Sequence, residues 1–425
     1  MGSKLHEQRS TIIRAAEKIM GDIRDLKLDN IQSGKPIGIF KFVLQKITEG
    51  RHEVLSEAMR LGRSDKRLLE IVSRYYDIDA SELNLYGLNK LLWISDPKEE
   101  IDIDSILAPL NINSTPNAVS LSSTQKSFLK SVSILGREPS PSWIGYCANK
   151  ISFDESVPKI ECGIVSYIDS IRTCDILEWE ILQAVGLMRD AHIDSIPAAL
   201  TLRNELHSKI NNPILDLRSR NAELALSVVI VIQDGVRNGA CVGLRSTKGV
   251  SVHGGLYGVV PAGMFSIEAN DIRNEYSLRH AFYREYLEEI FNRSDLREFS
   301  SALDIRSFYN DPNLKYLFKM LESGSAKLLL TGIVMNLLNL RPEICAMLII
   351  SDPDWYDRHS NGGGGLSKFT LNPEFKEGQA SYKSFDELSD TLLRDRISQW
   401  VPPHVAALEL ALRRAGFVDL PPIHP

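Results

Sequence analysis

The chain has 425 residues, of which 43% are hydrophobic and 24% are charged, and its formal net charge is −6. These proportions are typical of folded globular proteins and exclude a wholly disordered, collagen-like or fibrous chain. The length suggests about two or three domains. The slightly acidic balance gives no support to a general binder of nucleic acid or anionic membranes.

The cysteines and histidines give no sign of a zinc site, because neither the five cysteines nor the nine histidines are spaced like zinc ligands. An odd number of widely separated cysteines indicates buried, reduced thiols and therefore predicts a cytoplasmic protein. The charged stretch from Lys4 to Arg9 lacks the apolar segment of a secretory signal. The most apolar run, Leu328 to Leu340, is too short for a membrane span, so we expect no membrane association.

Residues 1–94 have the apolar spacing of helices, for example at Leu68, Val72 and Tyr76, and we expect them to form a helical domain. Residues 55–83 loosely resemble a helix-turn-helix. Their nearly balanced charge favours a plain helical bundle over a DNA reader, so nucleic acid is a weakly supported partner. The oligomeric state is left open, with a homodimer among the alternatives.

The next two regions carry no clear chemistry. Residues 95–125 contain an acidic run and many Asn, Ser and Pro residues, which are typical of a linker. Residues 126–222 have mostly helical spacing, and we expect a helical middle region whose apolar residues serve core packing.

From residue 223 onward, strand-like and helix-like segments alternate. The β-branched run Leu224–Ile232 ends in a turn and is followed by a hairpin partner at Asn238–Leu244. Further strands are expected at 328–334 and 344–350, and helices at 276–291, 384–393 and 403–413. The pattern predicts an α+β domain over residues 223–425.

The expected helix 276–291 contains three glutamates, Glu285, Glu288 and Glu289, whose spacing places their carboxylates on one face. An adjacent apolar face can bury against a sheet; it consists of Tyr283, Leu287 and Ile290. Carboxylates this close repel one another, and a hard divalent cation would offset the repulsion. The alternative is a solvated acidic face balanced by neighbouring arginines.

Upstream of this helix, the segment from Tyr257 to Gly263 reads as a strand followed by the turn Pro261-Ala262-Gly263. Together with the hexapeptide 284–289 (Arg-Glu-Tyr-Leu-Glu-Glu), this order of elements resembles the Nudix family. Members of that family hydrolyse nucleoside diphosphates linked to another moiety. The resemblance covers residues 223–420 and implies a Nudix-like α/β/α sandwich with a mixed sheet, preceded by a mostly α-helical N-terminal region.

The sequence departs from the family box in three ways. Seven more residues separate Gly263 from Arg284 than in the family, the first-half glutamate is one position out of register at Glu268 or Glu275, and Phe291 replaces the closing glycine. We expect the inserted stretch 266–277 to bulge outward. The helix should then begin at Ser277 as its N-cap, which leaves the turn at 261–263 facing the three carboxylates across a cleft.

The resemblance implies a magnesium or manganese site held by Glu285, Glu288 and Glu289, in which the metal activates a water for attack on phosphorus. Glu289, Glu288 and Arg284 would be catalytic, and Arg284 would also hold Glu288 in place. The implied substrate-binding residues are Gly263, Pro261, Tyr257 and His253. The general base would be Glu289 or one of Asp352, Asp354 and Asp357, although turn formation and helix capping explain those aspartates more simply.

The implied function is a divalent-metal-dependent hydrolase that cleaves a diphosphate bond in a nucleoside diphosphate derivative, with a nucleotide-like small molecule as partner. The alternative is a catalytically degenerate Nudix-like module that senses a ligand and is coupled to a helical, DNA- or protein-binding N-terminal region. A third reading is a helical interaction scaffold in which the acidic helix is coincidental.

Overall fold

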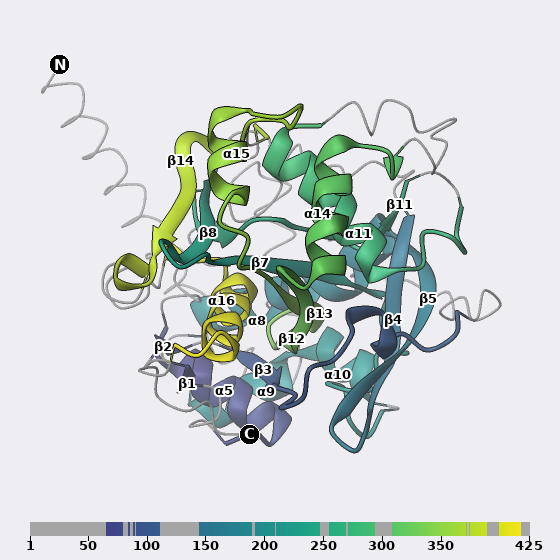
Figure 1. Cartoon of the computed structure of the whole chain (residues 1–425). Helices are drawn as coiled ribbons and strands as arrows, with labels where there is room; N and C mark the ends of the chain where they lie inside the picture. Colours follow the sequence, from purple (N-terminus) through teal and green to yellow (C-terminus); the bar gives the residue numbers. More distant parts are fainter. Residues whose placement is uncertain are drawn as a thin grey trace, which may run out of the picture.

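The computed structural model describes residues 65–79, 84–85, 88–89, 91–110, 144–188, 192–208, 210–246, 255–268, 271–293, 308–370, 372–373, 375–388 and 399–417. These residues form an α+β structure with helices and mixed sheets (Figure 1). Most of the expected N-terminal helical domain, including the start of the helix-turn-helix-like stretch, lies outside the described residues.

The larger sheet has eight strands in the order β14-β8-β7-β13-β12-β3, with β10 paired to β7 and β9 paired to β8. The bounds are β3 Leu92–Ser95, β7 Ala225–Gln233, β8 Asn238–Arg245, β9 Tyr257–Val259, β10 Ala262–Met264, β12 Ala326–Asn336, β13 Arg341–Ile350 and β14 Phe375–Ser384. Only the β7–β13 pair among these ladders is parallel, so the sheet is mixed. The strands expected at 224–232, 238–244, 328–334 and 344–350 are confirmed.

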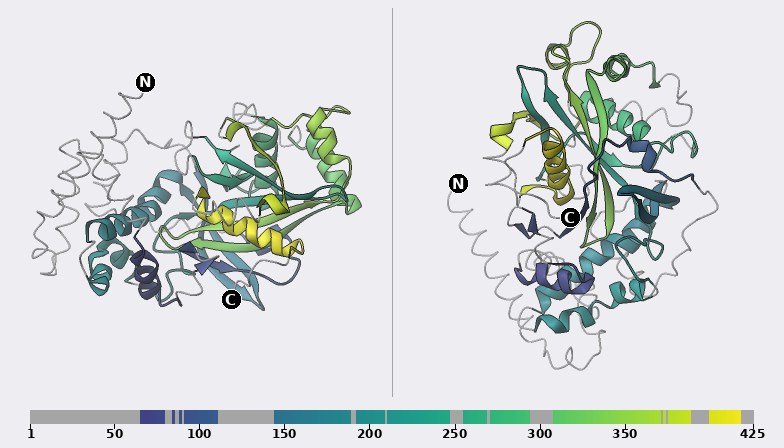
Figure 2. Two further views of the ribbon diagram at one scale, coloured as in Figure 1. Left: turned by 90° about the vertical axis from the view of Figure 1, so that its left-hand side faces the viewer. Right: turned by 60° about the horizontal axis from the view of Figure 1, so that its bottom comes forward.

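Helices cover both faces of this sheet. Side chains alternate along a strand, and in β7 Leu226 and Val228 join one buried cluster while Val229 and Val231 join another. The first cluster includes residues of α11 (Leu278–Glu285) and α14 (Pro312–Ser323), and the second lies under α16 (Pro402–Arg414). The right-hand view of Figure 2 shows α16, in yellow, on one side of the strands. Burial on both faces explains the continuous apolar run of β7.

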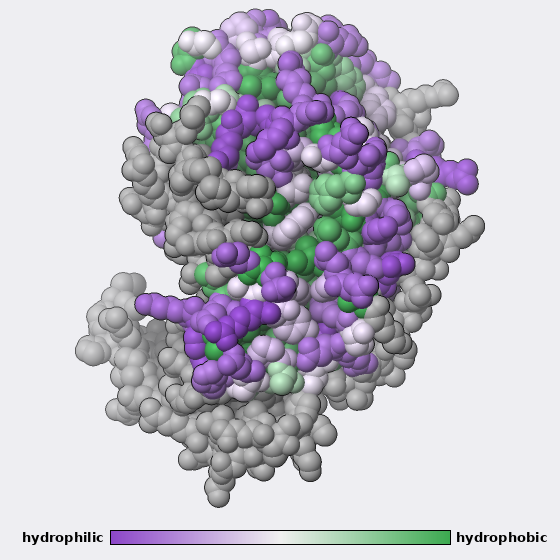
Figure 3. Space-filling model, turned by 90° about the horizontal axis from the view of Figure 1, so that it is seen from below, coloured by the Kyte–Doolittle hydropathy of each residue, from purple (hydrophilic) through white to green (hydrophobic). Residues whose placement is uncertain are grey.

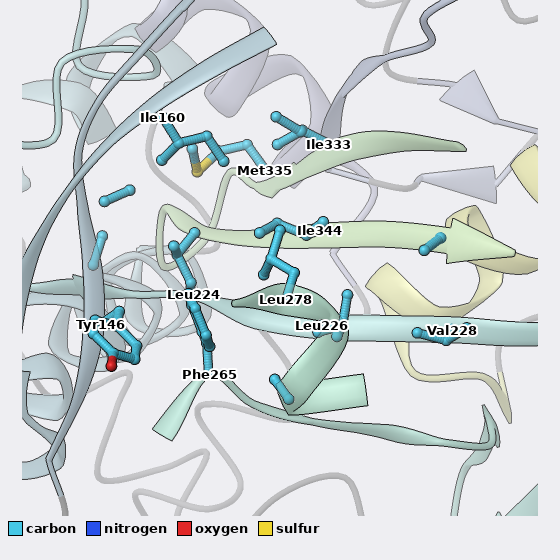
Figure 4. Close-up of a cluster of buried hydrophobic side chains, with 14 of the residues drawn as sticks. Tyr146, Ile160, Leu224, Leu226, Val228, Phe265, Leu278, Ile333, Met335 and Ile344 are labelled. Atoms are coloured by element: carbon cyan, nitrogen blue, oxygen red, sulfur yellow. The ribbon is translucent and has the colours of Figure 1, made fainter. Parts of the chain in front are cut away.

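A second sheet has four strands: β4 (Ile144–Asp154), β5 (Val157–Ser166), β6 (Ala222–Glu223) and β11 (Ser266–Ile267). Tyr146, Leu224 and Phe265 join it to the core of the larger sheet (Figure 4). The β4–β5 hairpin contradicts the helical pattern expected there. Short apolar runs do not separate strand from helix, and here burial alternates, with Ile160 and Cys162 inside.

Helices do follow this hairpin. They are α7 (Tyr167–Ser170), the π-helical turn η2 (Ile171–Asp175), α8 (Ile176–Leu187), the short 3-10 turn η3 (Ile193–Ser195), α9 (Ile196–Ala199) and α10 (Thr201–His207). Near them lies α5 (Arg67–Tyr76), which buries Leu68, Ile71 and Val72 and confirms the helical spacing read in that segment. Two-residue strands β1 (Asn84–Leu85) and β2 (Leu88–Asn89) pair with each other.

Part of the segment expected to be a linker is ordered and packs against the core. We call its described residues, 95–110, the strap. Strand β3 pairs with β12. Further along the chain, Ile101 forms an isolated β-bridge with Leu330 of β12. Ile103 and Ile106, in the 3-10 turn η1 (Ile103–Ile106), are fully buried. The domain boundaries at 94, 125 and 222 stay predictions, but hydrogen-bonded strands and buried contacts cross them.

The described surface is mainly polar. On the face shown in Figure 3, hydrophilic residues dominate, and apolar residues appear between them. Among the described residues, Phe153 and Val236 are the exposed large hydrophobic side chains. No helix in the described ranges is both long and apolar enough to span a membrane.

Candidate active site

The helix that carries the glutamates begins where the sequence predicts. The Ser277 Oγ accepts the backbone N–H of His280 at 3.1 Å, which confirms Ser277 as the N-cap of α11. The helix continues into a π-helical turn, η4 (Tyr286–Ile290). Its apolar face is buried as expected, since Tyr283 is 7% exposed, Leu287 is fully buried and Ile290 is 3% exposed.

The three glutamates are buried. Glu285, Glu288 and Glu289 are only 6%, 4% and 3% exposed, so the solvated-face interpretation is wrong. Removing a carboxylate from water is costly unless hydrogen bonds or opposite charges compensate. The contacts of these side chains therefore decide what the site can do.

The turn before the helix lies directly against the carboxylates. The backbone N–H of Ala262 donates to Glu289 Oε2 at 2.7 Å. A methyl group added at Gly263 would overlap the carboxylate of Glu285. Pro261 follows a cis peptide bond, and its carbonyl accepts the N–H of Val228 at 3.0 Å, which ties the turn to β7. The turn therefore faces the carboxylates of Glu285 and Glu289 as predicted, but the expected cleft between them is wrong, because turn and carboxylates are in direct contact.

Arg284 joins the helix to β10. Its guanidinium donates to the carbonyl of Met264 at 3.0 Å and to Glu285 Oε1 at 2.8 Å. Burial alone would lower the pKa of Arg284, but the carboxylates, Glu285 foremost, raise it above its ordinary value. The expectation that Arg284 holds Glu288 is corrected: its hydrogen-bonded carboxylate is Glu285, because the carbonyls of β10 draw the guanidinium toward the turn.

Asp104, in the strap, caps the same helix and was not identified from the sequence. Its Oδ1 accepts the backbone N–H of Leu278 at 2.6 Å and of Arg279 at 3.2 Å, and its Oδ2 accepts the hydroxyl of Ser277 at 3.0 Å. Asp102 forms an ion pair with Arg279. Burial raises the pKa of Asp104. The sequence offers no local signal for this contact, because Asp104 lies far from the helix along the chain.

The inserted stretch packs inward, which corrects the expected outward bulge. Strand β11 pairs with β4, and the Tyr276 ring lies 5.1 Å from that of Tyr146. Glu275, only 2% exposed, accepts the backbone N–H groups of Glu268 and Asp271 at 2.7 and 3.1 Å. The reason is hydrophobic, because the Tyr276 ring packs against the buried ring of Tyr146 on β4.

Tyr257, in β9, belongs to a different group of contacts. Its ring lies 5.6 Å from that of Trp400, and its carbonyl accepts the N–H of Val401 at 2.9 Å. It thus faces the segment that leads into α16. His253 lies outside the described residues.

The three aspartates proposed as alternative bases lie in or just before α15 (Trp355–Asn361), and each forms hydrogen bonds or an ion pair. Asp352 accepts the backbone N–H groups of Asp354 and Trp355 at 2.9 and 3.0 Å. Asp354 pairs with Arg358 at 2.7 Å, and Asp357 pairs with Arg237. These contacts fit the simpler interpretation of turn formation and helix capping.

A second buried charged group lies at the other end of β10. Nη2 of Arg341 lies 3.4 Å from the sulfur of Met264 and 3.8 Å from Glu223 Oε2, while its Nη1 lies 3.3 Å from Asp175 Oδ1. Glu223 is 2% exposed, and burial raises its pKa to about 7 despite the attraction of Arg341.

The carboxylates are not arranged as a ready-made metal centre. Within the part of the chain that the structure describes, no three His, Cys, Asp or Glu side chains are placed to hold one ion. What the geometry does provide is a tight turn in direct contact with Glu285 and Glu289, a buried guanidinium bonded to Glu285, and the buried carboxylate of Glu288 on the same helix. No protein-family model matches this sequence, and the comparison with curated proteins finds no similar one.

Proposed function

We propose that residues 223–425 form a Nudix-like α/β/α sandwich that acts as a divalent-metal-dependent hydrolase on a diphosphate bond in a nucleoside diphosphate derivative. The observation that carries this proposal is the contact of Ala262 and Gly263 with Glu289 and Glu285. The contact exists although seven extra residues separate turn and helix. A diphosphate bound at the turn would therefore lie beside the carboxylates.

The charge of the site favours a cation. Three buried carboxylates are accompanied by one buried guanidinium, that of Arg284, so the group has a net negative charge when all are ionised. Carboxylate oxygens suit Mg²⁺ and Mn²⁺, and Glu285, Glu288 and Glu289 would hold the ion. A bound ion would neutralise the diphosphate and lower the pKa of a coordinated water.

Arg284, Glu289 and Gly263 would each have a separate role in the reaction. Arg284 would hold the carboxylate of Glu285 in a fixed position against β10. Glu289 would act as the base once its carboxylate leaves the N–H of Ala262, because it is the glutamate that accepts a backbone hydrogen bond from the turn. Gly263 has no side chain, so a phosphate would reach its backbone once the carboxylate of Glu285, which fills the space beside it, moves away.

The second candidate is a ligand-sensing module without turnover. Two hydrogen bonds favour it, because they already occupy carboxylate oxygens: Glu289 accepts the N–H of Ala262, and Glu285 accepts from Arg284. The absence, in the described ranges, of side chains already grouped around a metal position points the same way. In this case the site would bind a nucleotide-like molecule and leave it intact.

Incubation of the full chain with a panel of nucleoside diphosphate derivatives and Mg²⁺ or Mn²⁺ separates the two functions. Release of phosphate or a nucleoside monophosphate, dependent on metal, supports the hydrolase. Binding of a substrate in calorimetry without any release supports the sensor. Neither binding nor release across the panel would contradict both.

A further inference from the structure

Two fully buried arginines, Arg203 and Arg220, lie close together where α10 meets the turn between β12 and β13. Arg203 donates to the carbonyls of Leu177 at 3.0 Å and Leu337 at 3.1 Å, and also to Leu338 and to the hydroxyl of Tyr76. Arg220 donates through Nε to the carbonyl of Leu340 at 3.2 Å. Both side chains thus hold the buried turn through its backbone.

The charge of this pair is poorly compensated. Glu180 acts electrostatically on Arg203, but its oxygens accept the backbone N–H groups of Leu202 and Arg203, and burial raises its pKa to about 7. Asp216, the acid that acts on Arg220, pairs with the exposed Arg218. No ion pair to either buried arginine exists among the described side chains. Burying two positive charges without an ion pair is strongly unfavourable.

Several donors in the same place have no acceptor. The terminal nitrogens Nη1 and Nη2 of Arg220, the Nε of Arg203 and both ring nitrogens of His207 lack a hydrogen-bond partner within the described structure. Burial, reinforced by the two arginines, lowers the pKa of His207 to about 2, so its ring is neutral and donates through one nitrogen. Buried donors are nearly always satisfied in native proteins, by protein, water or an ion.

We propose that a phosphate group binds between Arg203 and Arg220. Two guanidinium groups match a phosphate in charge, and their planar N–H donors match its oxygens in geometry. The need to hold the β12–β13 turn explains the hydrogen bonds that the arginines make, but it leaves the terminal nitrogens of Arg220 unexplained.

The adjoining tyrosines suggest where the phosphate enters. The guanidinium of Arg203 lies 5.8 Å from the ring centroid of Tyr75 and 5.6 Å from that of Tyr76. Both tyrosines are half-buried, and the Tyr75 hydroxyl donates to Asn204 at the surface at 2.7 Å. We infer that a phosphate would enter past these rings, since they lie between the Arg203 guanidinium and the surface residue Asn204. The site shares none of its residues with the carboxylate helix.

Thermal unfolding of the full chain tests the proposal. Inorganic phosphate and adenosine monophosphate are added separately, with sodium chloride at equal ionic strength as reference. Either phosphate compound should raise the melting temperature by a few degrees once it is far above its Kd. Stabilisation by both identifies free phosphate as sufficient, and stabilisation by the monophosphate alone identifies a phosphate ester. No stabilisation by either overturns the proposal.

Variants assign the effect to this place. Arg220→Met should weaken phosphate binding about tenfold or more, because charge-assisted hydrogen bonds are lost. Arg218→Met is the matched control, since Arg218 is two residues away, exposed and paired with Asp216, and it should respond like the parent. An equal response of Arg220→Met and the parent overturns the assignment.

Hydrogen exchange of the parent protein gives an answer even if Arg220→Met does not fold. Phosphate should slow amide exchange in α5 and α10, which carry Tyr75, Tyr76 and Arg203. Slowed exchange that is confined to other elements, including α11, would overturn the proposal. Protection of α11 alone would instead place the phosphate at the carboxylate helix.

Discussion

Gly263 in β10 and Glu285 in α11 touch so closely that no side chain larger than hydrogen fits between them. Arg284 fixes the same two elements from the next position of the helix, through the carbonyl of Met264. The seven extra residues between turn and helix therefore do not separate them. They fold into β11 and an aromatic contact with β4, so the insertion is absorbed beside the site rather than within it.

We predict that Gly263→Ala destabilises the protein by about 1–3 kcal/mol, because the added methyl must displace a buried carboxylate that Arg284 holds. It should also abolish metal-dependent hydrolysis if the proposed function holds. Gly363→Ala is the control, since no atom lies near its added methyl. Urea denaturation measures both variants, and equal stability of Gly263→Ala and the parent would contradict the packing argument.

We predict that Glu289→Gln leaves the fold intact, because the amide oxygen of glutamine still accepts the N–H of Ala262. Without metal, this variant and Glu288→Gln should be no less stable than the parent, since each removes one of several like charges. Turnover should fall about 100-fold or more in each if a carboxylate acts in acid–base or metal chemistry. Unchanged rates in both variants would remove the catalytic assignment.

The sequence predicts those parts of the site that depend on local patterns. The β-branched run of β7, the N-cap at Ser277 and the glutamate spacing of α11 each determine a structure within a few residues. Burial of the glutamates could not be predicted, because it depends on β10 and on the core beneath the helix.

Long-range contacts account for the other differences. The acidic residues around Asp104 are typical of a linker. Asp104 has a structural role because it contacts the start of α11, which lies far away in the sequence. The β4–β5 hairpin has short apolar runs that a helix could equally bury. Its strands pair mainly with each other, and β4 also pairs with β6 and β11, which are distant in sequence and extend the sheet.

Asp104→Ala should destabilise the protein by about 1–2 kcal/mol, because two backbone N–H groups at the start of α11 lose their acceptor. Asp102→Ala removes an ion pair with the partly exposed Arg279 and the acceptor of a single backbone N–H, that of Asp104, so it should cost less, about 1 kcal/mol. Chemical denaturation at neutral pH compares the two. A smaller loss for Asp104→Ala than for Asp102→Ala would contradict the capping role.

Glu223 should make stability depend on pH. Its pKa rises from 4.5 to about 7 on folding, chiefly through burial. Between these values the folded protein retains a proton that the unfolded chain has released. Stability therefore falls as the pH rises through this window, by about 3 kcal/mol in total, and levels off above pH 7.

Glu223→Gln isolates this contribution, because glutamine has the same shape and does not titrate. Glu180 has a similarly raised pKa and acts in both proteins, so it cancels when the two are compared. We predict that the variant gains stability relative to the parent as the pH rises from 4.5 to 7, with the largest gain above pH 7. Urea denaturation at half-unit pH intervals measures the difference. A constant difference across this range would show that Glu223 remains ionised in the folded protein, with Arg341 outweighing its burial.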